Sequence, residues 1–251
     1  NVDGNKAVAE VKSPGGYFLA LNNFTERYDI DLSNNYSLLK VNGPPSALGL
    51  YRDGNRITAL PKAGEFDMSY EKASLDSFPY LLRKGSNALL IGTSGGFRLR
   101  DAEKLGALGI TALEPDKAVF ELVKKANKTV LNSTNIKLLN ESPFSAGKNK
   151  FGIIDIAPDY INGNDSGKYA FTVDAVRFYF DSLNVDGIVS IPVSISEFTV
   201  YAVKMLETCR RALLESGISE PGKYIAVYRS TWTARILISK KPFTGAEIAD
   251  L

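Results

Sequence analysis

The clearest chemical signal in the sequence is a glycine-rich turn that comes directly after an apolar run, with an acid at the end of the next apolar run. The turn is Gly92-Thr93-Ser94-Gly95-Gly96, and the acid is Glu114. Glycines let a ligand approach the backbone, and a helix that begins at such a turn offers free N–H groups. A carboxylate at the second strand end can accept hydrogen bonds from two ribose hydroxyls. The pattern predicts a nucleoside site, although Glu114 could instead cap a helix that begins at Pro115.

Further acids follow two later apolar runs. Glu141 comes just after residues 136–139, where it could accept a hydrogen bond from an adenine amine or lie in solvent. Asp155 lies at the end of the run 151–156, and Asp159 follows it. Open α/β sheets bind their ligands at the carboxyl ends of their strands, so these acids are candidates for the same site.

Composition excludes several classes of chemistry. The chain has no histidine and a single cysteine, Cys209, which lies in a run with helical periodicity and is expected to be a buried thiol. Acid–base steps must therefore fall to Asp, Glu, Tyr or Lys, and no metal is expected. The net charge is +2 without a basic stripe, so nucleic acid is not an expected partner. No apolar run is long enough to span a membrane.

The elements that would position these acids change character along the chain. Residues 1–69 contain short β-rich runs between turn clusters and predict a small, mostly antiparallel β domain, with Tyr36–Val41 as one of its strands. Residues 70–251 alternate strands with helices, which predicts a mainly parallel sheet covered on both faces and closed by an antiparallel hairpin. The first helix is expected over 70–82. Arg98, just after the glycine turn, is expected on a solvated helix face.

Several segments resemble the spermidine synthase (polyamine aminopropyltransferase) family. They are residues 76–83, 88–97, 111–116, 169–179 and 183–190. The ending, Lys241–Ile248, is similar to that of spermidine-synthase-like domains attached to multi-helix membrane proteins. The resemblance implies a Rossmann-like, class I methyltransferase fold over 70–251, preceded by a small β domain. It also implies a cytoplasmic location, association as dimers or tetramers, and attachment to a membrane domain outside this chain.

The resemblance also implies a reaction and a set of site residues. The co-substrate would be decarboxylated S-adenosylmethionine or a related adenosyl-sulfonium donor, and the acceptor a putrescine-like amine. The donor would contact the turn 92–96, Glu114 with Pro115, Glu141 for the adenine amine, and Asp155. Asp155 would also be the base that takes the proton of the amine.

Two of the places where this chain departs from the family pattern lie beside the candidate acids. The acid of the family's glycine motif is replaced by Gly95, and Ser94 stands where a glycine is usual. After Asp155 the family's Ser-Ser-Asp-Pro is replaced, with Asp159 as the candidate substitute one position later. Two alternatives therefore stay open. One is an S-adenosylmethionine-dependent methyltransferase, and the other is a catalytically degenerate ligand-binding or scaffold domain of a membrane protein.

Overall fold

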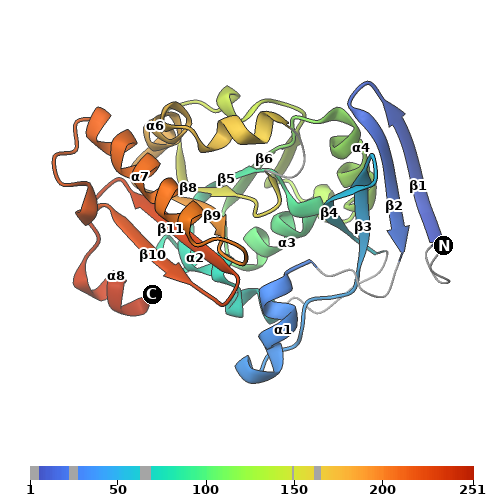
Figure 1. Cartoon of the computed structure of the whole chain (residues 1–251), viewed down its shortest axis with the longest axis horizontal. Helices are drawn as coiled ribbons and strands as arrows, with labels where there is room; N and C mark the ends of the chain where they lie inside the picture. Colours follow the sequence, from blue (N-terminus) through green and yellow to red (C-terminus); the bar gives the residue numbers. More distant parts are fainter. Residues whose placement is uncertain (1–5, 23–27, 63–68, 149, 161–164) are drawn as a thin grey trace.

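The computed structural model describes residues 6–22, 28–62, 69–148, 150–160 and 165–251. Its centre is a seven-stranded sheet in the order β10-β11-β9-β8-β5-β6-β7. The five strands from β9 to β7 are parallel, and β10 and β11 add an antiparallel hairpin at one edge (Figure 1). This confirms the predicted α/β fold class. The strands are β5 (Asn87–Ile91), β6 (Gly109–Leu113), β7 (Ile136–Leu139), β8 (Phe151–Ile156), β9 (Leu183–Ser194), β10 (Ile225–Arg229) and β11 (Thr233–Ser239).

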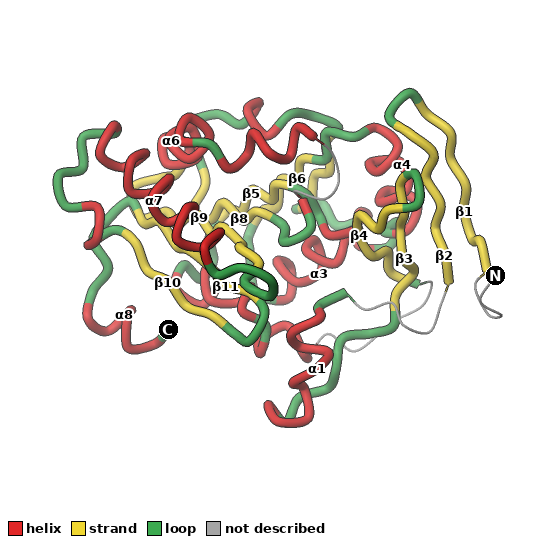
Figure 2. Tube along the Cα trace, viewed as in Figure 1, coloured by secondary structure: helices red, strands yellow, loops and turns green. Residues whose placement is uncertain are grey.

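Helices follow most of the parallel strands and cover the sheet (Figure 2). Two of them begin where the sequence provides a capping side chain. Thr172 accepts a hydrogen bond from the Ala175 amide at 3.3 Å, and Asp116 accepts one from the Ala118 amide at 2.9 Å. Of the helices in the described part of the chain, none is long and apolar enough to cross a bilayer. The helices after β4 are α2 (Phe78–Leu82), α3 (Phe97–Lys104), α4 (Lys117–Ala126), α6 (Val173–Ser182), α7 (Val200–Glu215) and α8 (Gly245–Asp250).

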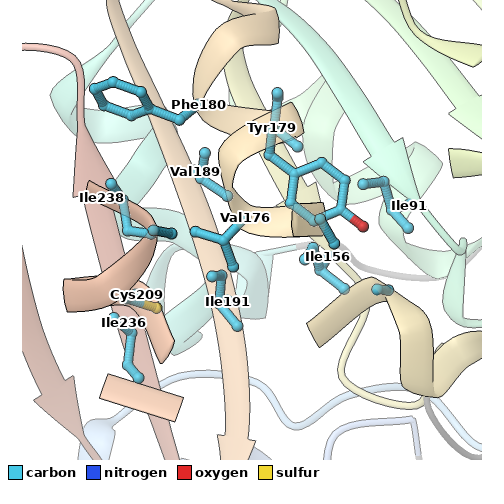
Figure 3. Close-up of a cluster of buried hydrophobic side chains, with 14 of the residues drawn as sticks. Ile91, Ile156, Val176, Tyr179, Phe180, Val189, Ile191, Cys209, Ile236 and Ile238 are labelled. Atoms are coloured by element: carbon cyan, nitrogen blue, oxygen red, sulfur yellow. The ribbon is translucent and has the colours of Figure 1, made fainter. Parts of the chain in front are cut away.

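The sheet is buried on both faces because its central strands are apolar at successive positions. In β5, Leu89 and Ile91 belong to the cluster that packs against α6 and α7, whereas Ala88 and Leu90 belong to the cluster that packs against α3. Figure 3 shows the first cluster, where Val176 and Tyr179 of α6 lie near the side chains of the sheet. Cys209 of α7 is fully buried there, as predicted. The sheet is thus held rigid beneath its carboxyl-terminal edge.

The N-terminal part forms a separate four-stranded antiparallel sheet in the order β1-β2-β3-β4. Its apolar face packs on α4, through residues such as Phe18, Leu50 and Ile57 against Val119 and Val123. The sheet therefore sits beside the helix that follows Glu114, at the right of Figure 1. The predicted boundary between 69 and 70 stays a prediction, with one sheet on each side of it. The strands are β1 (Lys6–Ser13), β2 (Gly16–Asn22), β3 (Ala47–Arg52) and β4 (Asn55–Pro61).

The structure corrects one strand of the N-terminal region. The strand predicted over Tyr36–Val41 is wrong, because most of that segment is the last part of helix α1 (Ile30–Leu39). The Asp29 carboxylate accepts from the amide of the buried Leu32 at 2.8 Å and starts the helix. Lys40, at φ 56°, ends it.

The single helix predicted over 70–82 is also wrong. Two 3₁₀ segments, η1 (Ser69–Ala73) and η2 (Leu75–Ser77), precede the short α2. Ser74 interrupts the helix because its hydroxyl accepts from the Asp76 amide at 3.2 Å. Pro79 lies in the first turn of α2, where its missing N–H costs nothing, so it starts this helix instead of ending one.

Candidate functional site

The glycine turn between β5 and α3 is fixed by close backbone contacts. Gly95 has a φ of 67°, and a Cβ added there would stand 1.6 Å from the carbonyl oxygen of Ala59 in β4. A Cβ added at Gly96 would stand 2.0 Å from Nδ2 of Asn127, a group that donates to the Gly95 carbonyl at 2.8 Å. The turn can therefore pack against β4 and Asn127 only because glycine stands at both positions. The acid that the family carries at the position of Gly95 has no room here.

Glu114 lies at the carboxyl end of β6 and faces this turn. Its side chain is buried, and within the described part of the chain it accepts a hydrogen bond from the Thr93 hydroxyl, at 3.5 Å. Burial, followed by the nearby charges of Asp159 and Asp116, raises the pKa of Glu114 to about 8. Asp116 caps α4, so the alternative in which Glu114 is only a helix cap is wrong. A buried carboxylate with one long hydrogen bond has capacity left for ribose hydroxyls.

The crevice between Glu114 and the turn is narrow. Its cavity has a volume of about 20 Å³, enough for roughly one water molecule. Tyr160, which follows β8, lines this cavity and packs on the turn, since a Cβ added at Gly92 would stand 2.7 Å from its Cδ2. Among the described residues, the buried Tyr160 hydroxyl has no hydrogen-bond partner. A nucleoside can enter only if Tyr160 leaves Gly92.

A second, much larger cleft adjoins this crevice along the carboxyl-terminal edge of the sheet. Its volume is about 1080 Å³, and its walls come from α1, from the ends of β8 and β9, and from the β10–β11 hairpin. Ser94 and Asp159 line both cavities, and the Ser94 hydroxyl donates to Asp159 at 2.8 Å. Asp159 is half-buried, and desolvation raises its pKa despite hydrogen bonds from Thr58 and Ser94. This carboxylate therefore stands where the two cavities meet.

Asp155 has a different environment, in a buried network of charges beneath the cleft. One of its oxygens pairs with Arg98, and the other lies 3.3 Å from Nη1 of Arg235. Both arginines also pair with Asp76, and Arg98 pairs with Asp101 at 3.1 Å. Three carboxylates thus share two guanidinium groups, all of them buried. Arg98 is fully buried, so its expected place on a solvated helix face is wrong.

Three tyrosines complete the network. Tyr80 donates to Asp155 at 3.0 Å, while Tyr28 and Tyr70 donate to Asp101 at 2.6 and 3.2 Å. Burial raises the pKa of Asp101 to about 6, with Arg98 and the tyrosine hydrogen bonds opposing the shift. The lone pairs of Asp155 are directed at protein donors, and Asp155 lines neither cavity. Its environment is that of a structural ion pair.

The remaining predicted site residues lie at the margin. Glu141 is exposed and lines neither cavity, so its contact with an adenine amine stays a prediction. Pro115 is half-buried, and its carbonyl accepts from Asn140 at 3.1 Å. Asn140 also donates to the Glu114 carbonyl at 2.8 Å and so fixes the chain where β6 ends. Within the described ranges, no group of three or more His, Cys, Asp or Glu residues could hold a metal ion.

Sequence reasoning missed the arginines of the network. Arg235 could have been suspected because it is a lone charge inside the apolar strand Thr233–Ser239. Arg98 and Asp101 are spaced for an i,i+3 ion pair on one helix, which is a weaker signal. Their partners Asp76 and Asp155 are far away in the sequence, and no local pattern joins them.

Comparison with known proteins identifies the fold. No family model and no curated protein matches the sequence. Spermidine synthase from Thermotoga maritima matches with a TM-score of 0.62 and 18% identity, over 96% of this chain and 75% of that one. A spermidine synthase in complex with the transition-state analogue AdoDATO matches with a TM-score of 0.64 and 18% identity, over 96% and 76%. The chain therefore has the fold of these spermidine synthases, and in this chain a small antiparallel sheet precedes a Rossmann-like, class I methyltransferase-type domain.

Proposed function

We propose that this chain is a group transferase that binds an adenosyl-sulfonium donor between the glycine turn and Glu114 and transfers a group to an amine in the large cleft. The observation that carries the proposal is the position of Glu114. A buried carboxylate at the end of β6, aimed at Thr93 of the turn, suits the two hydroxyls of a ribose. The likeness to spermidine synthases supports it at the level of the fold.

The two cavities suit the two substrates of such a reaction. The donor would lie in the crevice and the acceptor in the cleft, with the reacting atoms near Ser94 and Asp159, which line both. Displacement at a sulfonium carbon needs a neutral amine in line with the breaking bond. The proton of the amine then has to pass to a nearby base.

Asp159 is the acid that we assign to this role. It faces both cavities, and its raised pKa makes it a better proton acceptor than an ordinary carboxylate. The Ser94 hydroxyl, 2.8 Å away, holds it in place. Asp155, the other acid predicted for this role, is paired with Arg98 and Arg235 and would support the sheet edge from below.

A binding experiment with methylthioadenosine tests the proposal. Titration calorimetry above pH 8, where Glu114 is ionised, should detect it on the wild-type chain, and Glu114→Gln should lose most of the affinity because an amide accepts only through its oxygen. Glu141→Gln is the matched control, an exposed acid near the same sheet edge. No heat and no change of melting temperature at saturating nucleoside would refute the proposal.

The identity of the donor follows from the same assay. Decarboxylated S-adenosylmethionine binding more tightly than S-adenosylmethionine would indicate aminopropyl transfer, and the reverse order methyl transfer. Both donors should be tested, because this chain has Gly95 where the family has an acid. The backbone of β4 occupies the space that the side chain of that acid would need.

A non-catalytic domain is a second candidate, favoured by one observation. Tyr160 lines the crevice, and about 20 Å³ is too little for a nucleoside. In this alternative Tyr160 is a permanent plug. Tyr160→Ala should then create a methylthioadenosine site that the wild-type chain lacks, whereas a transferase binds the nucleoside with Tyr160 present.

A further inference from the structure

The acidic residues of the large cleft are already engaged by the protein. Asp76 pairs with both Arg98 and Arg235. Asp29 caps α1 and also accepts from the Ser74 hydroxyl at 3.2 Å. Asp159, at the junction with the crevice, is the remaining aspartate of the lining. Among the described residues, the carboxylates that a second ammonium group would meet deep in the cleft are those of Asp29 and Asp76, which already have a capping or a cationic partner.

The cations of the cleft add to this effect. Of the described residues that line the cleft, the charged ones are three aspartates and three arginines, so their formal charges sum to zero. The arginines are Arg56, Arg229 and Arg235, and the last is buried. Arg56 also lowers the pKa of Asp159, so it lies close to the acid that would face the amine. A dication loses its hydration on entering such a site and gains little in return.

Large apolar side chains form part of the cleft wall, beside polar ones such as Asn34 and Asn35. Leu32, Leu38 and Leu39 of α1 line it, and Trp232 lines it from the turn of the β10–β11 hairpin. Leu38 is 82% exposed and Leu39 50% exposed, and Trp232 is 41% exposed. Exposed leucines and a tryptophan around a cleft gain free energy when an apolar ligand covers them.

These observations together define the acceptor. We propose that the acceptor of the large cleft is a monoamine carried on an apolar alkyl or arylalkyl body, and not a diamine. The amine would reach Asp159, and the apolar body would lie against the leucines of α1 and Trp232. The inference rests on the proposed function for the role of the amine, but the binding preference itself does not require a donor.

A matched pair of ligands tests the inference on the wild-type chain. n-Hexylamine and 1,6-diaminohexane have the same length and differ only in a terminal methyl or ammonium group. We expect calorimetry to show n-hexylamine binding at least about ten times more tightly. Equal or tighter binding of the diamine, or no binding of either amine, overturns the inference.

A pair of variants locates the preference in the cleft. Leu39→Asp places a carboxylate on the apolar wall, and it should weaken n-hexylamine and strengthen 1,6-diaminohexane. Leu108→Asp, at an exposed leucine outside the cleft lining, should change neither. If both variants behave like the wild type, the amine binds elsewhere and the inference fails.

Methylthioadenosine separates this inference from the proposed function. Should the nucleoside bind while the diamine is preferred, the acceptor assignment fails and the transferase proposal stands. Should n-hexylamine be preferred while the nucleoside never binds, the transferase proposal fails and the cleft remains a site for apolar amines.

Discussion

Replacing Glu114 with glutamine should stabilise the chain while it removes nucleoside binding. The carboxyl has a pKa of about 8 in the folded protein and 4.5 as the reference value. Below pH 4.5 it is protonated in both the folded and unfolded states, and it makes no difference to stability. Between pH 4.5 and 8 the unfolded chain releases the proton while the folded chain keeps it. The free energy of unfolding therefore falls as pH rises through this window.

The size of the effect follows from that pKa difference. At about 1.4 kcal/mol per pH unit, the 2.5 units between 4.5 and 7 correspond to a loss of about 3 kcal/mol at pH 7. Glutamine avoids this loss, but its amide group needs a partner of its own, which costs about 1 kcal/mol. The net gain is about 2 kcal/mol, or a rise in melting temperature of about 4–8 °C for a chain of this size.

Thermal unfolding at several pH values measures the effect. Near pH 4.5 the variant should melt slightly below the wild type, because only the cost of the amide remains; the two melting temperatures should cross near about pH 5, and the variant should become progressively more stable than the wild type up to pH 8. Asp116→Asn is not a suitable control, because Asp116 caps α4. Glu141→Gln is a suitable control, because Glu141 is exposed. A difference between wild type and variant that stays constant with pH would refute the assigned environment of Glu114. So would a variant that is less stable at pH 7.

Three further predictions concern the surroundings of the site. Arg98→Met should cost about 3–5 kcal/mol in urea unfolding, because it leaves buried carboxylates without their partner; a cost below 1 kcal/mol would contradict the network. Gly95→Ala should disrupt the packing of β4 and destabilise the chain far more than Gly106→Ala, which has open space and should cost about 1–2 kcal/mol for its positive φ. Ser94→Ala removes the hydrogen bond to Asp159 but keeps the backbone angle, so it should lower kcat in a transfer assay at least about tenfold with little change in methylthioadenosine affinity; unchanged kcat would contradict the role given to that acid.

The sequence predicts most of the Rossmann-like part because its signals are local. The strands are short apolar runs with clear ends, and Thr172 caps α6 as its position before the helix predicts. The approach of Glu114 to the glycine turn follows from the parallel order of β5 and β6. The N-terminal region is less predictable, because Tyr36–Val41 contains strand-forming residues, but the helix that Asp29 caps continues through Leu39.

The parts of the site that sequence could not predict depend on contacts between distant segments. The pairing of Asp155 with Arg235 joins positions separated by 80 residues, and it decides whether Asp155 can act as a base. The contact of Gly95 with Ala59 brings the N-terminal sheet onto the turn and excludes an acid there. A sequence motif shows that an acid is present, but it does not show whether a basic residue from a distant segment pairs with that acid, as Arg235 does with Asp155.

The two departures of this chain from the family pattern have a common structural explanation. Ser94 has a φ of 44°, a conformation in which a glycine would be less strained, yet its hydroxyl is the group that holds Asp159. Because Asp155 is neutralised by arginines, the acid available to a substrate is the one on the segment after β8, and that segment has no strand to fix it. A serine in the turn fixes it instead. The strained serine, the displaced acid and the buried arginines are therefore parts of one arrangement, in which Asp159 lines both cavities.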